Sequence, residues 1–207
     1  MFKSIGFINK IIKVLILSDL VLLFGWGLIS PILAIFITQQ IKGGDVKLAG
    51  IAIGIYWLSK SIIQIPIARY LDKRKGEKDD YYFMIFGIIL TSLVPLGYIF
   101  ATLPWHIYLL QLIHSFGMGM NIPAWGGIFI RHTDKGKEAL SWGLESSSIG
   151  IGAGIAGILG GIVAKSFGFT PLFIGVFILG MISAFLCFLI KRGLLPKEEI
   201  TSIPKEE

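Results

Sequence analysis

The segment IAIGIYWLSKSIIQIPIARYLDKRKG, residues 51–76, contains the features that decide the fold. Most of it is an apolar run long enough to cross a bilayer, because about 20 helical residues span a hydrocarbon core of about 30 Å. A basic cluster then marks the next loop. Lys60 interrupts the run near its centre, where an ionisable residue costs roughly 2.5–3.5 kcal/mol on insertion scales. The segment therefore predicts a transmembrane helix whose lysine needs a physical reason.

The composition of the whole chain agrees with a membrane protein. Of its 207 residues, 54% are hydrophobic and only 15% are charged, whereas a soluble domain carries about 25% charged residues. The net charge of +6 does not indicate a nucleic-acid partner, because the charges form short clusters between apolar runs. The lipid bilayer is therefore the expected surroundings of most of the chain.

Six apolar runs of 22 to 26 residues follow one another along the sequence. A backbone in lipid must satisfy its own hydrogen bonds, which selects helices for runs this long, and none of the runs alternates as a transmembrane β-strand does. We therefore predict an all-α integral membrane bundle of six transmembrane helices. The expected spans are 14–38, 48–71, 82–103, 105–130, 139–164 and 167–190.

The basic residues predict the orientation of these spans. Fifteen of the 19 lysines and arginines lie on one side: before the first run, in the last turn of the second run or just after it, and after the fourth and sixth runs. Three lie on the opposite side. The positive-inside rule then places both termini in the cytoplasm of a multi-pass plasma-membrane protein. The expected divisions are a cytoplasmic N-terminus (1–13), a transmembrane domain (14–190) and a polar cytoplasmic tail (191–207). The first run is too long for a signal peptide, so we interpret it as an uncleaved helix.

Ionisable residues in the interiors of the runs are confined to four of the six. Asp19, Lys60, His114 and Glu145 lie in the first, second, fourth and fifth runs, and helical spacing places further polar or aromatic residues on the same faces. Such a pattern predicts a water-accessible cavity enclosed by four helices, with the third and sixth facing lipid. The candidate residues for a substrate or ion pathway are Lys60, Asp19, Glu145, His114, Asn121, Gln64, Tyr56 and Trp26.

Two interpretations of these charges stay open from the sequence. Lys60 either lines the cavity and binds a solute or ion, or it forms a structural ion pair with Asp19 or Glu145. One basic and two acidic groups would suit a zwitterion, an anion or a proton cycle. The sequence contains no Gly-x-Ser-Gly protease motif, no metal-ligand spacing and no cofactor motif, so we expect no enzyme activity, no metal and no cofactor. Six glycines between 150 and 161 predict close packing of the fifth helix.

Several motifs resemble those of major facilitator transporters. Residues 68–76, ARYLDKRKG, resemble the loop between helices two and three of that family: Asp72 and Lys73 match its pattern, while Ala68 replaces a glycine and Gly76 comes one residue late. Residues 111–119 are similar to the fourth helix, residues 152–161 to the glycine motif of the fifth, and residues 167–169 to the turn into the sixth.

The resemblance implies both an architecture and a function. Family members consist of two six-helix halves with a solute bound between them near the membrane midplane. The resemblance implies that helices one, two, four and five line this path. The chain would supply one half, of the N-terminal type, and would transport a small solute with a partner: a second copy of itself, or a separately encoded second half. The alternative is a non-transporting membrane scaffold or assembly protein that keeps the fold.

Overall fold

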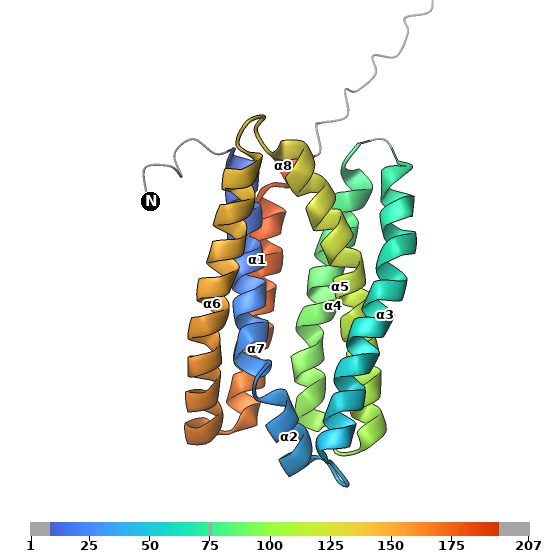
Figure 1. Cartoon of the computed structure of the whole chain (residues 1–207), viewed down its shortest axis with the longest axis vertical. Helices are drawn as coiled ribbons and strands as arrows, with labels where there is room; N and C mark the ends of the chain where they lie inside the picture. Colours follow the sequence, from blue (N-terminus) through green and yellow to red (C-terminus); the bar gives the residue numbers. More distant parts are fainter. Residues whose placement is uncertain (1–8, 75, 195–207) are drawn as a thin grey trace, which may run out of the picture.

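The computed structural model describes residues 9–74 and 76–194, and the regular structure in this part of the chain is helical. Six long helices run up and down the bundle, and two short ones lie at its ends (Figure 1). The predicted N-terminal and C-terminal segments lie partly outside the described residues, at 1–8 and 195–207. The helices are α1 (Lys10–Ile29), α2 (Leu33–Gln40), α3 (Val46–Asp72), α4 (Lys78–Phe100), α5 (Pro104–His132), α6 (Glu138–Phe167), α7 (Phe169–Leu189) and α8 (Lys191–Leu194).

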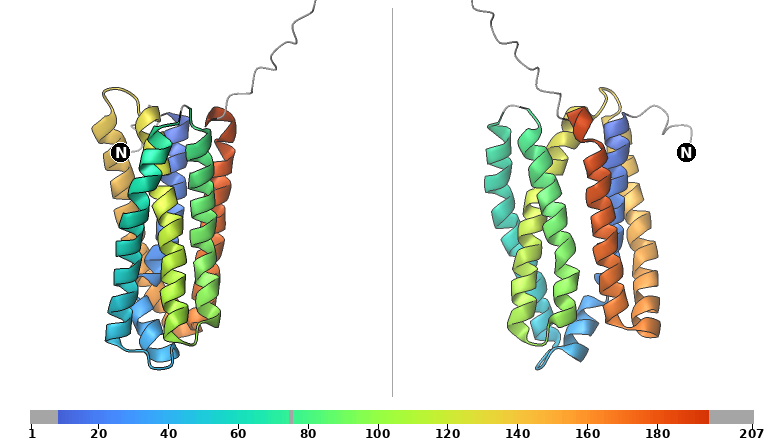
Figure 2. Two further views of the ribbon diagram at one scale, coloured as in Figure 1. Left: turned by 90° about the vertical axis from the view of Figure 1, so that its right-hand side faces the viewer. Right: turned by 180° about the vertical axis from the view of Figure 1, so that it is seen from behind.

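The long helices pack as two groups of three. In one group α1 packs against α6 and α7, and in the other α5 packs against α3 and α4. Contacts between α4 and α7 join the groups, and seen from behind these two helices lie in front of α1 and α5 (Figure 2). Helices α3 and α6 therefore stand at the two outer edges of the bundle, on either side of α1 and α5 (Figure 1).

Five of the long helices in the described residues are long and apolar enough to cross a membrane: α1, α3, α4, α6 and α7. The remaining long helix, α5, has 29 residues, but polar side chains including Gln111, His114 and Asn121 lower its hydropathy. It packs between α3 and α4 as part of the same bundle. The prediction of an all-α membrane fold is confirmed, and α5 corresponds to the run expected at 105–130.

The first predicted span was wrong as a single helix over 14–38. Helix α1 ends at Ile29, and α2 begins at Leu33 as a separate short helix. Pro31 lies between them, where it has no N–H to donate and its ring opposes the carbonyl of the preceding turn. The Phe36 ring of α2 packs edge-on against Phe173 of α7, with centroids 5.0 Å apart. The break thus turns α2 beneath the bundle (Figure 1).

Local sequence signals explain where several helices begin and end. The Asn9 side chain accepts a hydrogen bond from the Ile11 N–H at 3.0 Å and caps α1. Asp45 caps α3 in the same way, accepting from the Leu48 N–H at 2.6 Å. Helix α5 begins with a proline, which needs no intrahelical donor at that position. Gly168, with φ of 84°, separates α6 from α7 in a backbone region that favours glycine.

The glycines of α6 divide into a packed face and an open face. A Cβ on Gly160 would overlap the Leu28 carbonyl of α1, and one on Gly152 would lie 2.6 Å from Leu20 Cδ1. The predicted close approach of small residues is therefore confirmed for the face toward α1. On the other face, Gly150 and Gly154 meet nothing within 4 Å. That face has no partner helix in the described part of the chain.

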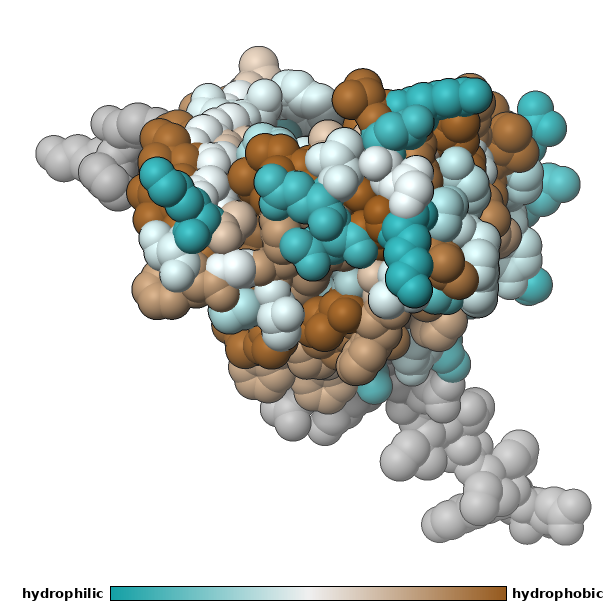
Figure 3. All heavy atoms as spheres, turned by 90° about the horizontal axis from the view of Figure 1, so that it is seen from below, coloured by the Kyte–Doolittle hydropathy of each residue, from teal (hydrophilic) through white to brown (hydrophobic). Residues whose placement is uncertain are grey.

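The two ends of the bundle differ in charge as the sequence predicted. The start of α1, the α3–α4 and α5–α6 connections and α8 lie at one end (Figure 1), and they carry the larger number of basic residues. The opposite end carries α2 and the exposed side chains of Lys42, Lys47 and Lys165. Seen from that end, hydrophilic residues form separate patches among hydrophobic ones (Figure 3). The connections therefore alternate between the ends in the expected order.

Candidate functional site

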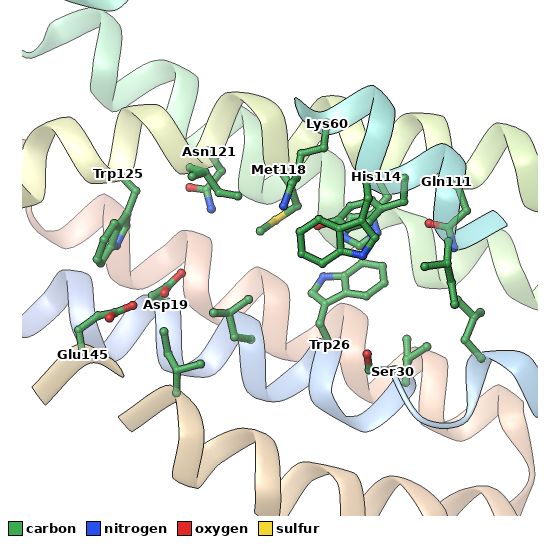
Figure 4. Close-up of a pocket in the computed structure, with 18 of the residues that line it drawn as sticks. Asp19, Trp26, Ser30, Lys60, Gln111, His114, Met118, Asn121, Trp125 and Glu145 are labelled. Carbon is green, nitrogen blue, oxygen red and sulfur yellow. The ribbon is translucent and has the colours of Figure 1, made fainter. Parts of the chain in front are cut away.

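A cavity of about 500 Å³ lies where α1, α3, α5 and α6 face one another. Among the described residues its wall comes from these four helices, the α1–α2 connection and the first residue of α2, and α4 and α7 contribute none of it. This arrangement matches the prediction that four helices share a polar interior and two do not. Figure 4 shows the side chains that line the cavity, among them Asp19, Trp26, Ser30, Lys60, Gln111, His114, Met118, Asn121, Trp125 and Glu145.

Seven of the eight predicted pathway residues lie in the cavity wall. They are Asp19, Trp26, Tyr56, Lys60, His114, Asn121 and Glu145. Gln64 is not among the lining residues; it lies one turn beyond Lys60 on α3 and is half-buried. The structure thus brings together side chains from four helices, while their role in a pathway stays a prediction.

Aromatic rings form a continuous column across the cavity. The His114 ring stacks between Trp26 and Tyr56, with centroids 3.6 Å and 4.3 Å away. Trp57 then packs edge-on against Tyr56, at 5.3 Å. Trp125 and Trp142 also line the cavity, so four of the five tryptophans of the chain face it. Rings contributed by α1, α3 and α5 therefore hold the two groups of helices together and give the site flat apolar surfaces.

Lys60 is buried in this site without an ion-pair partner. Its side chain is 8% exposed, and its Nζ lies 3.7 Å from the centroid of the Trp57 ring and 5.3 Å from that of Tyr56. Among the described residues no carboxylate oxygen lies within 4.0 Å of Nζ. The alternative of a structural ion pair with Asp19 or Glu145 is therefore wrong for this structure. Cation–π contacts hold the ammonium group in place but leave its charge uncompensated.

The two acidic residues of the cavity lie beside each other instead. The side chains of Asp19 and Glu145 lie next to each other at one end of the cavity (Figure 4), and Glu145 is 7% exposed. Two ionised carboxylates can only accept hydrogen bonds, so a direct hydrogen bond between these side chains requires a proton on one of them.

Two of the residues that line the cavity have a buried polar atom without a hydrogen-bond partner in the described part of the chain. The Trp26 Nε1–H and the Asn121 Oδ1 have no hydrogen-bond partner within the described protein, although Asn121 is only 2% exposed. Leaving such a group unpaired costs about 1–3 kcal/mol. The amide of Gln111, which is 3% exposed, also lines the cavity. Together these groups can recognise both donors and acceptors.

A second group of charges surrounds the buried Asp80 at the end of the bundle that carries the α3–α4 and α5–α6 connections, here called the loop end. It was not predicted from the sequence. Asp80 at the start of α4 is 2% exposed and accepts a hydrogen bond from Arg131 Nη2 at 2.7 Å. Glu77 accepts from Arg131 Nε at 3.0 Å and lies 2.8 Å from His132 Nε2. In the sequence these residues lie in or next to the connections between apolar runs, and the partners are 51 to 55 residues apart. Their pairing could therefore be found only in the tertiary structure.

The loop motif lies at the same end of the bundle. Asp72 is the last residue of α3, Lys73 follows it, and both side chains are exposed. Gly76 has a φ of 89°, which explains why a glycine is needed there. Arg74 lies over the Tyr70 ring and forms an ion pair with Asp79 at 3.7 Å. The motif therefore shapes the α3–α4 connection and does not contribute to the cavity.

The sequence of the chain matches that of a known protein family. A model of the Major Facilitator Superfamily matches residues 15–207, which is nearly the whole chain. The chain belongs to the Major Facilitator Superfamily. Proteins of this superfamily are multi-pass membrane transporters and not enzymes, as the sequence analysis had predicted.

A curated relative in the superfamily supports this membership. An uncharacterised MFS-type transporter of the archaeon Methanocaldococcus jannaschii is 24% identical over 184 residues. The match covers 89% of this chain and 46% of the relative, so the chain spans about half the length of the relative it matches. Within the described residues no group of three or more His, Cys, Asp or Glu side chains could hold a metal ion.

Proposed function

We propose that this superfamily member transports a small solute by alternating access, and that the cavity is its half of the solute path. The uncompensated charge of Lys60 carries this proposal. A buried cation without a carboxylate is expensive in the membrane interior, and a solute that supplies the missing charge repays this cost. The carboxyl groups of Asp19 on α1 and Glu145 on α6 add groups that can exchange a proton or bind a cation.

A single six-helix bundle cannot alternate access by itself, so we propose that it pairs with a second bundle of the same kind. The edges of the cavity support this pairing. In the most apolar stretch of α6 only 17% of residues are buried, and in α3 only 22%, compared with 44% in α4. Gly150 and Gly154 of α6, and Gly50 and Gly54 of α3, meet nothing within 4 Å. Such faces of small residues allow another helix to approach closely. The second bundle would come from a second copy, as a homodimer, or from a separate second-half chain.

The orientation is also proposed, with the basic loops and both termini in the cytoplasm and the protein in the plasma membrane. Cysteine labelling tests it against a low background, because the native Cys187 is buried. An impermeant maleimide should label Lys165→Cys in intact cells but Lys135→Cys only after permeabilisation. The reverse pattern would overturn the orientation.

Transport by the purified chain in proteoliposomes tests the function. Lys60→Gln should lower transport about tenfold to hundredfold, because a hydrogen bond to a charged group contributes roughly 1.5–3 kcal/mol. Gln64→Ala is the matched control, since Gln64 lies one turn away on α3 and outside the cavity wall. Equal transport by the two variants would remove Lys60 from the path. A chain that transports no solute with any partner would favour the scaffold alternative.

Particle mass in mild detergent tests the pairing. Gly154→Leu adds a large side chain to the open face of α6 and should convert a two-bundle particle into a single bundle. Gly175→Leu is the control: it makes the same change on α7, also with nothing within 4 Å, on the side away from the cavity. A wild-type chain that is always a single bundle would exclude a homodimer, and the remaining partner would then be a separate chain.

A further inference from the structure

The charges of the cavity are separated along its length. In Figure 4, Asp19 and Glu145 lie at one end, together with Trp125 and near Asn121, while Lys60 lies further along toward Ser30. The unpartnered atoms follow the same order. The Asn121 Oδ1 is an acceptor on the acidic side, and the Trp26 Nε1–H is a donor on the Lys60 side. One end of the cavity is therefore suited to a positive group and the other to a negative one.

Contacts with α5 set the separation of these ends. The Lys60 backbone carbonyl lies against Gly119 of α5: its oxygen is 3.6 Å from the position that a Cβ on Gly119 would occupy. On the other side, Trp125 Nε1 donates to the carbonyl of Leu15, one turn from Asp19, at 3.4 Å. Gly119 and Trp125 are six residues apart, which corresponds to about 9 Å along the helix axis. The lysine and the carboxyl pair therefore do not share one point of the cavity.

The charge balance narrows the kind of solute. Lys60 is the basic side chain, lysine or arginine, in the cavity wall of the described structure, and Asp19 and Glu145 are its acidic side chains. A monocation would leave the lysine uncompensated and add a like charge to the cavity, and a monoanion would do the same to the acidic pair. A dipolar solute that presents one charge to each end satisfies both. Between the ends the wall is largely apolar, with Leu23, Trp26, Met118 and Ile122.

We propose that the cavity binds a zwitterion with an apolar or aromatic body between its two charges, the anionic group on Lys60 and the cationic group on Asp19 and Glu145. An α-amino acid, whose charges are adjacent, fits this layout less well. The inference rests on the proposed function for the identity of the site, but it concerns binding and can be tested without transport.

Calorimetric titration of the purified full-length chain with four matched probes tests the proposal. The probes are 4-(aminomethyl)benzoate, with opposite charges at its two ends; its isomer phenylglycine, with adjacent charges; and the singly charged 4-methylbenzoate and 4-methylbenzylamine. We expect 4-(aminomethyl)benzoate to bind about tenfold or more tightly than each of the other three. Equal or tighter binding of any of the three would overturn the proposal.

Variants test which charged group of the probe binds at each end of the cavity. Lys60→Gln should weaken the binding of 4-(aminomethyl)benzoate about tenfold and leave the binding of 4-methylbenzylamine unchanged or tighter. The double variant Asp19→Asn, Glu145→Gln should also weaken the binding of 4-(aminomethyl)benzoate, but should leave the binding of 4-methylbenzoate unchanged or tighter. Gln64→Ala should bind all four probes as the wild type does. If none of the four probes binds while the chain transports another solute in a Lys60-dependent way, this proposal fails and the proposed function stands. If the zwitterion binds selectively but no transport occurs, the proposed function fails and this proposal stands.

Discussion

Two groups of charges in this bundle, one around the buried Asp80 and one in the cavity, differ in how completely their charges are compensated by opposite charges. At the loop end, Asp80 and Glu77 both accept hydrogen bonds from Arg131, and His132 adds a further contact to Glu77. In the cavity, Lys60 has aromatic rings around its ammonium group but no carboxylate within 4.0 Å in the described part of the chain. The first group is complete within the protein, whereas the second needs something from outside.

Pairing within the protein distinguishes a structural charge from a functional one. A fully paired buried group contributes to a defined structure, and removing one partner leaves a charge in a poor environment. An unpaired buried group lowers stability and is retained only where a ligand supplies its partner. The same type of substitution should therefore change stability in opposite directions in the two groups.

The largest expected change in the free energy of unfolding is for a substitution at the loop end. Arg131→Gln removes the cation from Asp80, which is 2% exposed, and should lower the free energy of unfolding by roughly 2 kcal/mol. The value lies below that of a fully buried pair because the Arg131 side chain is 41% exposed. Detergent-to-SDS titration followed by tryptophan fluorescence measures it. Lys135→Gln, on the exposed part of the same loop, is the control, and an identical midpoint for the two variants would contradict the assignment.

A smaller effect of opposite sign is expected in the cavity. Lys60→Met keeps the apolar stem and removes an uncompensated charge, so it should raise the free energy of unfolding by about 1 kcal/mol while transport is lost. The same titration measures the change. Lys47→Met serves as the control, since Lys47 is an exposed lysine near the start of the same helix. Destabilisation of the size expected for Arg131→Gln would show that Lys60 has a structural partner after all.

The smallest effect is expected for Asp19→Asn. The asparagine amide can donate a hydrogen bond to Glu145 as a protonated Asp19 carboxyl would, so the free energy of unfolding should change by no more than about 0.5 kcal/mol. Asp19→Leu has no donor and should destabilise the bundle by about 1–3 kcal/mol. Thermal unfolding in detergent compares the two. Equal losses in both variants would mean that the carboxyl pair does not share a proton.

Much of the fold could be predicted from the sequence, but the limits are instructive. The six apolar runs gave the six long helices to within a few residues, except that Pro31 divided the first run into α1 and α2. The four helices that line the cavity were identified correctly because buried polar residues in a membrane have few alternatives to a shared interior. Gln64 was placed in the cavity by its spacing from Lys60, and the structure leaves it outside. Helical spacing fixes a face only approximately.

The sequence by itself determined the number of long helices, the end of the bundle to which each connection belongs, and which helices carry charge in their interiors. These are local properties, since hydropathy and charge along one run are compared directly with the thickness of the bilayer. Only the tertiary structure decided which charges meet: that Asp19 lies beside Glu145, that Lys60 forms an ion pair with neither, and that Arg131 reaches Asp80. Such pairings depend on the rotation and depth of one helix relative to another, and packing between side chains far apart in the sequence sets both.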